Sequence, residues 1–191
     1  MTDRGPPRNA VMGVWRKSKG SVNIRDARTG DREAIKDLTL SAYAEYSALM
    51  PYWDYYRENI IATLDEEKGG NQIVAEQNGV IVGSVLLYPA GTVFSSPDHE
   101  TTTLRWPEVR LLAVAPAARR QGVGAALMAE CVRRARKAGA QFLTLHTNTL
   151  MRAAIHLYER MGFRRYPEFD FSVGDDVIVR GYRLDLGEVR E

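Results

Sequence analysis

The sequence is poor in cysteine, in histidine and in long apolar runs. Its one cysteine, Cys131, excludes an internal disulfide and a cysteine-rich zinc site, and is typical of a reducing, cytoplasmic compartment. No apolar run approaches the roughly 18 residues of a membrane span, and the first ten residues lack the apolar segment of a secretory signal. The three histidines, His99, His146 and His156, share no metal-ligand spacing, so we expect no metal.

What is present fits one globular domain. The 191 residues are 45% hydrophobic and 26% charged, which argues against disorder. Residues 1–20 carry five basic side chains and one acidic side chain, a net charge of +4. Because the whole chain has a net charge of +2, the remaining residues have a net charge of −2. We therefore expect a basic, poorly ordered tail over 1–20 and a single domain over 21–191. The body has no basic block with interleaved aromatics, so neither nucleic acid nor membrane is an expected partner, and a homodimer is left open.

Hydrophobic periodicity predicts the element order β-α-α-β-β-β-α-β-α-β-β, which is a mixed sheet with helices on its faces. Asn78-Gly79 predicts a tight hairpin turn, and residues 89–107 read as one long loop that could act as a lid. The expected strands are 22–25, 72–77, 80–88, 108–114, 141–146, 163–166 and 176–185, and the expected helices are 31–47, 51–64, 122–138 and 151–161.

The segment 109–124, VRLLAVAPAARRQGVG, carries the strongest chemical signal. A buried strand leads into a short loop, and a helix begins at the two glycines. Unpaired amides at a helix start bind anions, glycines let the main chain approach a phosphate, and Arg119 and Arg120 add positive charge. No lysine of a Walker loop follows Gly122, and Leu127 stands where a dinucleotide fingerprint needs its third glycine. The segment therefore predicts a site for a diphosphate.

Two motifs resemble the GCN5-related N-acetyltransferase (GNAT) superfamily. Residues 119–124 resemble its motif A, [Arg/Gln]-x-x-Gly-x-[Gly/Ala], and residues 154–163 resemble its motif B, A-x-x-L-Y-x-x-x-G-F. The motifs stand in the right order, and the resemblance covers about residues 22–185. It implies an α/β (α+β) fold with a mixed, mostly antiparallel sheet, helices on both faces, and a V-shaped splay between the fourth and fifth strands. It also implies acetyl transfer from acetyl-CoA to a primary amine of a small molecule, peptide or protein, by direct attack in a ternary complex.

The resemblance also implies how acetyl-CoA is bound. Main-chain groups of residues 112–114 would pair with the pantetheine arm, and amides of residues 119–124 would bind the diphosphate. Met151 stands where many family members have an asparagine that contacts the coenzyme, and Asn148 lies one turn earlier as a substitute. The implied coenzyme residues are Leu112, Ala113, Val114, Arg119, Arg120, Gln121, Gly122, Val123, Gly124 and Asn148.

Two residues are implied to be catalytic. Tyr158 matches the family tyrosine near the thioester sulfur, and a phenol of pKa about 10 can donate to a thiolate of pKa about 8.5. The other interpretation is an aromatic of the helical core. Glu108 lies where many members hold a carboxylate base, acting directly or through water, and partial burial would raise its pKa. The other interpretation is a surface carboxylate paired with Arg105 or Arg110. His146 is a second base candidate, or simply a buried or solvated histidine.

An aromatic and acidic stretch in the first two helices is a candidate acceptor wall, with ordinary helix packing as the alternative. Two other functions are left open: a non-catalytic acyl-CoA-binding or regulatory domain, and a nucleic-acid-binding module driven by the tail. Cys131 lies on an apolar helical stripe and is expected in the core. The candidate wall residues are Tyr43, Glu45, Tyr46, Tyr52, Trp53, Asp54, Tyr55 and Tyr56.

Overall fold

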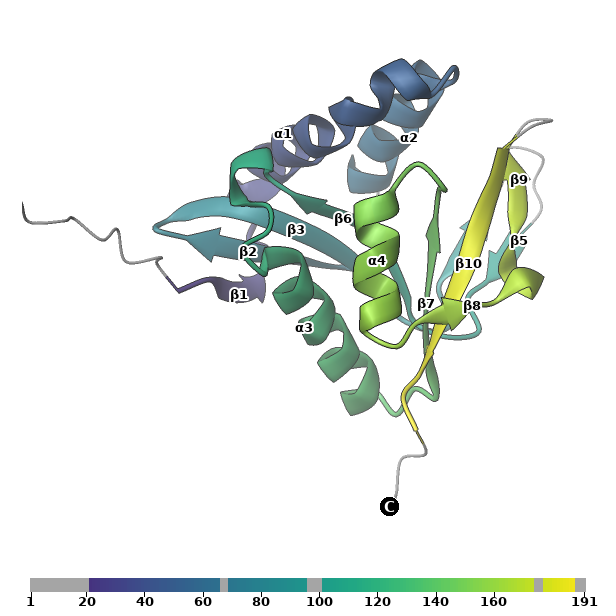
Figure 1. Cartoon of the computed structure of the whole chain (residues 1–191). Coiled ribbons are helices and arrows are strands. Elements are labelled where there is room, and N and C mark those ends of the chain that lie inside the picture. Colours follow the sequence, from purple (N-terminus) through teal and green to yellow (C-terminus); the bar gives the residue numbers. More distant parts are fainter. Residues whose placement is uncertain (1–20, 66–68, 96–100, 174–176, 188–191) are drawn as a thin grey trace, which may run out of the picture.

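The computed structural model describes residues 21–65, 69–95, 101–173 and 177–187, so the expected tail over 1–20 and His99 lie outside the described residues. Figure 1 shows helices packed around a central sheet. The helices are α1 (Arg32–Tyr43), α2 (Trp53–Asp65), α3 (Val123–Lys137) and α4 (Arg152–Arg160). The strands are β1 (Asn23–Asp26), β2 (Asn71–Gln77), β3 (Val80–Tyr88), β4 (Val93–Ser95), β5 (Thr101–Thr103), β6 (Glu108–Val114), β7 (Phe142–Thr147), β8 (Arg164–Arg165), β9 (Phe171–Val173) and β10 (Val177–Asp185).

The main sheet has the strand order β1-β2-β3-β6-β7-β10-β8, and β9 pairs with β10. Its neighbours are antiparallel except β6 and β7, which run parallel, so the prediction of a mixed, mostly antiparallel sheet is confirmed. In this parallel pair, Glu108 is opposite Thr144 and Val109 is opposite Leu145. The pairing therefore involves the first two residues of β6. The predicted splay beyond these pairs stays a prediction.

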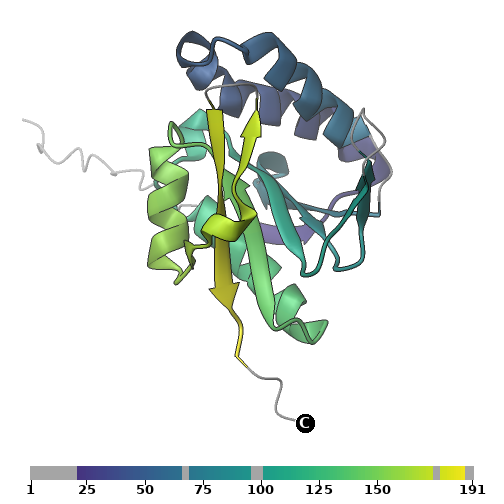
Figure 2. The same ribbon diagram turned by 90° about the vertical axis from the view of Figure 1, so that its right-hand side faces the viewer.

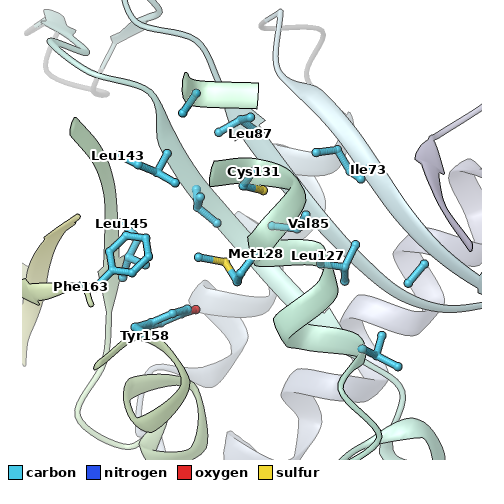
Figure 3. Packing of buried hydrophobic residues seen from close by; sticks show 14 of the residues in the cluster. Ile73, Val85, Leu87, Leu127, Met128, Cys131, Leu143, Leu145, Tyr158 and Phe163 are labelled. Carbon is cyan, nitrogen blue, oxygen red and sulfur yellow. The ribbon is translucent and has the colours of Figure 1, made fainter. Parts of the chain in front are cut away.

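The sheet separates two hydrophobic cores, which confirms helices on both faces (Figures 1 and 2). The larger core packs α3 and α4 on the strands, and Figure 3 shows Leu127, Met128 and Cys131 of α3 inside it. Cys131 is a buried free thiol, as predicted. The smaller core packs α1 and α2 through Leu38 and Ile60 on the other face. In the described part of the chain, no helix combines the length and apolar character needed to cross a bilayer.

A β-bulge interrupts β6 in the middle of the sheet. Ser84 pairs with Ala113 and Leu86 with Arg110, so one residue of β3 faces both Leu111 and Leu112. Leu111 has a φ of 49°, a left-handed conformation that costs a non-glycine residue about 1–3 kcal/mol. Beyond the bulge, Leu112 faces the α3 core, whereas Leu111 and Ala113 face the α1 core. The bulge therefore sets which side of the sheet each later residue of β6 meets.

Most predicted elements are present, with shifts of a few residues at their ends. The hairpin turn at Asn78-Gly79 is confirmed, since both residues have positive φ, 53° and 77°, between paired β2 and β3. The first helix is shorter than expected, because α1 ends at Tyr43 and the chain continues as a 3₁₀ helix over Ala44–Leu49. The strand β9, which adds to the edge of β10, was not predicted.

The prediction of one long loop over 89–107 is wrong. β4 and β5 lie within it and form a second, two-stranded antiparallel sheet. Phe94 of β4 contacts the buried Tyr88 at 4.9 Å between ring centroids, which ties this hairpin to the end of β3. A single apolar aromatic among threonines and serines gives little periodic signal, and this explains why the pattern was missed.

Candidate active site

Two neighbouring cavities share lining residues from α1, β6 and the region of α4. The first, of about 300 Å³, lies between α2, the start of β6, the end of β7 and the β9–β10 edge. The second, of about 600 Å³, lies between the end of β6, the start of α3 and α4. Four residues line both cavities and form their common wall: Tyr43, Leu112, Met151 and Tyr158. The two cavities are therefore adjacent at these residues.

The start of α3 forms one side of the second cavity. Gly122 is the N-cap of α3 and has a φ of 86°. Its carbonyl accepts the first hydrogen bond of the helix, from the Ala126 amide at 2.9 Å. The amides of Val123, Gly124 and Ala125 come before it in the helix, so they have no carbonyl of a preceding turn to bond. A Cβ on Gly124 would lie 3.3 Å from Leu157 Cδ2, so glycine also allows close approach to α4. The geometry is that of an anion-binding helix start.

Most predicted coenzyme residues line this second cavity. Residues 112–114 and 122–124 do so together with Arg119 and Arg120. Gln121 is absent from the lining, and its side chain donates to the Ala117 carbonyl. Of the expected phosphate-binding amides, that of Arg119 already donates to the Pro116 carbonyl at 3.4 Å, so it is not free as the sequence predicted.

The Arg119 side chain connects the second cavity to the end of α1. Its Nη1 donates to Glu45 Oε2 at 2.7 Å, and its Nη2 donates to the Ala42 carbonyl at 3.0 Å. Glu45 itself lines the second cavity, where Arg119 neutralises its charge. An anion can therefore approach this wall without facing an unpaired carboxylate.

Glu108 lies at the start of β6 in the first cavity and is buried, with 2% of its surface exposed. Its Oε1 accepts from Arg110 Nε at 2.6 Å, and its Oε2 lies 3.4 Å from His146 Nδ1. Burial raises the pKa of Glu108, but the hydrogen bond from His146 and the charge of Arg110 outweigh burial and hold the pKa below its ordinary value. The expectation of a raised pKa is wrong, because the sequence did not show that a second partner, His146, faces this carboxylate.

His146 joins Glu108 to the 3₁₀ helix Pro167–Phe169, which lies between β8 and β9 in the chain. Its Nε2 lies 2.8 Å from the Phe169 carbonyl, and because a carbonyl only accepts, Nε2 carries a proton. Its Nδ1 faces Glu108, so both ring nitrogens are engaged. The two residues stand 38 positions apart in the chain and meet because β6 and β7 are parallel neighbours. The pairing of Glu108 with Arg110 was one of the two interpretations, although the carboxylate is buried, whereas the contact of Glu108 with His146 was not predicted.

Tyr158 is buried, as its core interpretation predicts, and its catalytic role stays a prediction. It is buried in the larger core, and Figure 3 shows its ring beside Phe163, at 5.9 Å between centroids. It also lines both cavities. Burial, helped by the nearby phenol of Tyr56, raises the pKa of Tyr158 above its ordinary value, so the hydroxyl stays protonated at neutral pH. The result is a rigidly held O–H donor at the junction of the cavities.

The predicted aromatic wall is divided between the cavities. Tyr52, Tyr55 and Tyr56 join Tyr43 in lining the first cavity, whereas Tyr46 and Glu45 line the second. Trp53 and Asp54 line neither, so the acidic part of the expected wall is not at the first cavity.

Asn148 lines the first cavity rather than the second. Its Nδ2 donates to the Tyr52 hydroxyl at 3.0 Å, and its Oδ1 accepts from the Leu150 amide at 2.9 Å. Its predicted contact with the coenzyme stays a prediction. Within the described ranges, no group of three or more His, Cys, Asp or Glu side chains could hold a metal ion.

The sequence matches a known family model over most of this core. The model of the acetyltransferase (GNAT) family matches residues 33–163. An uncharacterized N-acetyltransferase of Bacillus subtilis (strain 168), YhfO, is 32% identical over 142 residues, which cover 74% of this chain and 89% of YhfO.

Solved structures share the fold. An acetyltransferase of the GNAT family from Staphylococcus aureus Mu50 superposes with a TM-score of 0.64 at 19% identity, covering 87% of this chain and 100% of that one. The ribosomal-protein-S18-alanine N-acetyltransferase of Escherichia coli gives 0.61 at 21% identity, over 90% and 97% of the two chains. A GNAT acetyltransferase of Brucella melitensis, solved in complex with acetyl-CoA, gives 0.57 at 20% identity, over 90% and 93%.

Proposed function

Since the chain belongs to the GNAT family of acetyltransferases, we propose that it transfers the acetyl group of acetyl-CoA directly to a primary amine of a small molecule or peptide. The observation that carries the proposal is the common wall of the two cavities, with Tyr158 in it. A coenzyme in the second cavity and an amine in the first would meet there. Holding two reactants in contact supplies much of the rate of a bimolecular reaction.

The main chain and side chains that line the second cavity are suited to the diphosphate of the coenzyme. The amides of Val123, Gly124 and Ala125 would bind the phosphate oxygens, and Arg120 would supply positive charge, since the charge of Arg119 is paired with Glu45. Main-chain groups of residues 112–114 would pair with the pantetheine arm, in a V-shaped opening between β6 and β7. We extend the proposal to residues 21–191 as one catalytic domain.

Tyr158 and Glu108 take different parts in the reaction. Acetyl-CoA supplies the acetyl group and a thiolate leaving group. Tyr158, protonated at neutral pH, donates a hydrogen bond at the position of the sulfur, and its raised pKa favours hydrogen bonding over full proton transfer. Glu108, ionised at neutral pH, attracts the ammonium of the acceptor, and the proton leaves through water to solvent, because a carboxylate of lowered pKa is a weak base. Attack is direct, because the cavities offer no activated nucleophile in the described residues.

The test is release of free CoA from acetyl-CoA with a panel of amines, beside calorimetry of coenzyme binding. We expect saturable binding of acetyl-CoA and amine-dependent CoA release. Binding without release for any amine would contradict the enzyme and favour an acyl-CoA-binding domain instead. Absence of binding would contradict the assignment of the second cavity.

A further inference from the structure

The first cavity has a lining that selects among amines. Its wall is mainly aromatic and aliphatic, with rings from α1, α2, α4 and β9 and apolar side chains from α2, β6 and the β9–β10 edge. Apart from its tyrosines, the charged or titratable groups in its described lining are Glu108, Arg110 and His146. An acceptor therefore buries most of its body against apolar surface.

The charge of this wall disfavours acceptors with several positive charges. Glu108 is the one carboxylate in the described lining, and both of its oxygens face cationic or donor groups, Arg110 and His146. A polyamine, an aminoglycoside or a lysine-rich peptide would need further carboxylates to replace the water around its additional ammonium groups. The described wall does not provide them.

Arg110 offers the opposite charge to the cavity in a fixed orientation. Its Nε is held by Glu108 at 2.6 Å, and its guanidinium carbon lies 4.0 Å from the centroid of the Phe94 ring and 5.6 Å from that of Tyr88. The side chain is 36% exposed. No hydrogen bond engages its two Nη groups within the part of the chain that the structure describes. A guanidinium with its edge free in an apolar cavity is suited to a carboxylate.

We propose that the acceptor is a monoamine that also carries a carboxylate and an apolar body, the class of α-amino acids with apolar side chains, and that Arg110 binds the carboxylate. This inference rests on the proposed function. Glu108 and Arg110 lie two residues apart on β6 and point to one face of the sheet. A negative and a positive group side by side match the two charges of an amino acid.

Matched acceptors test the proposal on the unaltered protein. Phenylalanine and 2-phenylethylamine differ by the carboxylate, as do leucine and 3-methylbutylamine, and spermidine represents the polycations. We expect kcat/KM for at least one amino acid to exceed that of its decarboxylated partner by about 10- to 100-fold, the value of one charge-assisted contact, with spermidine lowest. Equal or higher kcat/KM for the decarboxylated amines, or for spermidine, would overturn the inference while leaving the proposed function intact. Release of no CoA with any amine would contradict the proposed function itself.

Variants at Arg110 test whether this side chain causes the preference for amino acids over their decarboxylated amines. In Arg110→Gln the ratio of kcat/KM between each amino acid and its partner amine should fall to about one, whereas Arg110→Lys should retain part of it as a point charge. Arg57→Gln is the matched control, because Arg57 is exposed on α2 and lines neither cavity. An unchanged ratio in folded Arg110→Gln would overturn the assignment of Arg110. Thermal melts identify a variant that fails to fold, and the acceptor panel on the unaltered protein still decides the substrate class.

Discussion

At the scale of single residues, the Tyr158 hydroxyl is separable from the ring that packs in the core. In Tyr158→Phe the packing against Phe163 is kept and the donor is lost, so kcat should fall about 10- to 100-fold, with little change in the KM for acetyl-CoA. The fall in kcat is limited because a thiolate is a fair leaving group even without a hydrogen-bond donor. Steady-state kinetics measure it, and Tyr182→Phe is the control, because Tyr182 is buried in the same core but lines neither cavity. Equal kcat in the two variants would count against the role of Tyr158.

The buried carboxylate of Glu108 links stability to pH. Its pKa is lower in the folded protein than the roughly 4.3 of an unfolded glutamate, so its stabilising effect is complete above that value and is lost as the pH falls below it. We expect Glu108→Gln to lower the unfolding free energy by roughly 2–3 kcal/mol at neutral pH, less than for a fully buried pair because Arg110 is 36% exposed.

Urea denaturation of both proteins at a series of pH values measures this difference. Other carboxylates that lose charge in acid are common to both proteins and cancel in the comparison. The gap between the two unfolding free energies should close below about pH 4. A gap that is constant down to about pH 3, or one that widens, would show that the Glu108 pKa is not lowered by folding.

At the scale of elements, two glycines of α3 provide a matched pair. Gly122 before the helix and Gly139 after it have φ values of 86° and 71°, and a Cβ on either would meet nothing within 4 Å. Alanine at each position should therefore cost a similar 1–2 kcal/mol, about the strain of a left-handed alanine. The KM for acetyl-CoA should rise about tenfold in Gly122→Ala, because the neighbouring amides shift, and stay unchanged in Gly139→Ala. A similar KM in both variants would remove the helix start from the coenzyme site.

Local sequence predicted the elements well where one signal dominates. The turn at Asn78-Gly79, the helix that follows Gly122 and the apolar strand before it are each encoded within a few residues. The bulge at Leu111 was not predicted, because it depends on how β6 pairs with β3 and leaves no mark in the strand's own pattern. The β4–β5 hairpin was missed because short strands of threonine and serine resemble a loop.

At the scale of the whole molecule, the contacts between distant segments could not be predicted from the sequence. Residues 119–124 are contiguous, so the grouping of all of them except Gln121 at one cavity followed from the sequence. Glu45 and Arg119, which join the end of α1 to that loop, are 74 residues apart, and Glu108 and His146 meet only through the parallel pairing of β6 and β7. Such charge pairs determine which side chains at the site are available to a ligand, and they can be identified only once the fold is known.

The central claim is that coenzyme and amine meet at the wall shared by the two cavities. A crystal structure with acetyl-CoA tests it most directly. The account predicts the diphosphate within hydrogen-bond distance of the amides of Val123, Gly124 and Ala125, and the thioester beside Tyr158 and Leu112. A coenzyme bound elsewhere, or one whose thioester lies away from that wall, would contradict it.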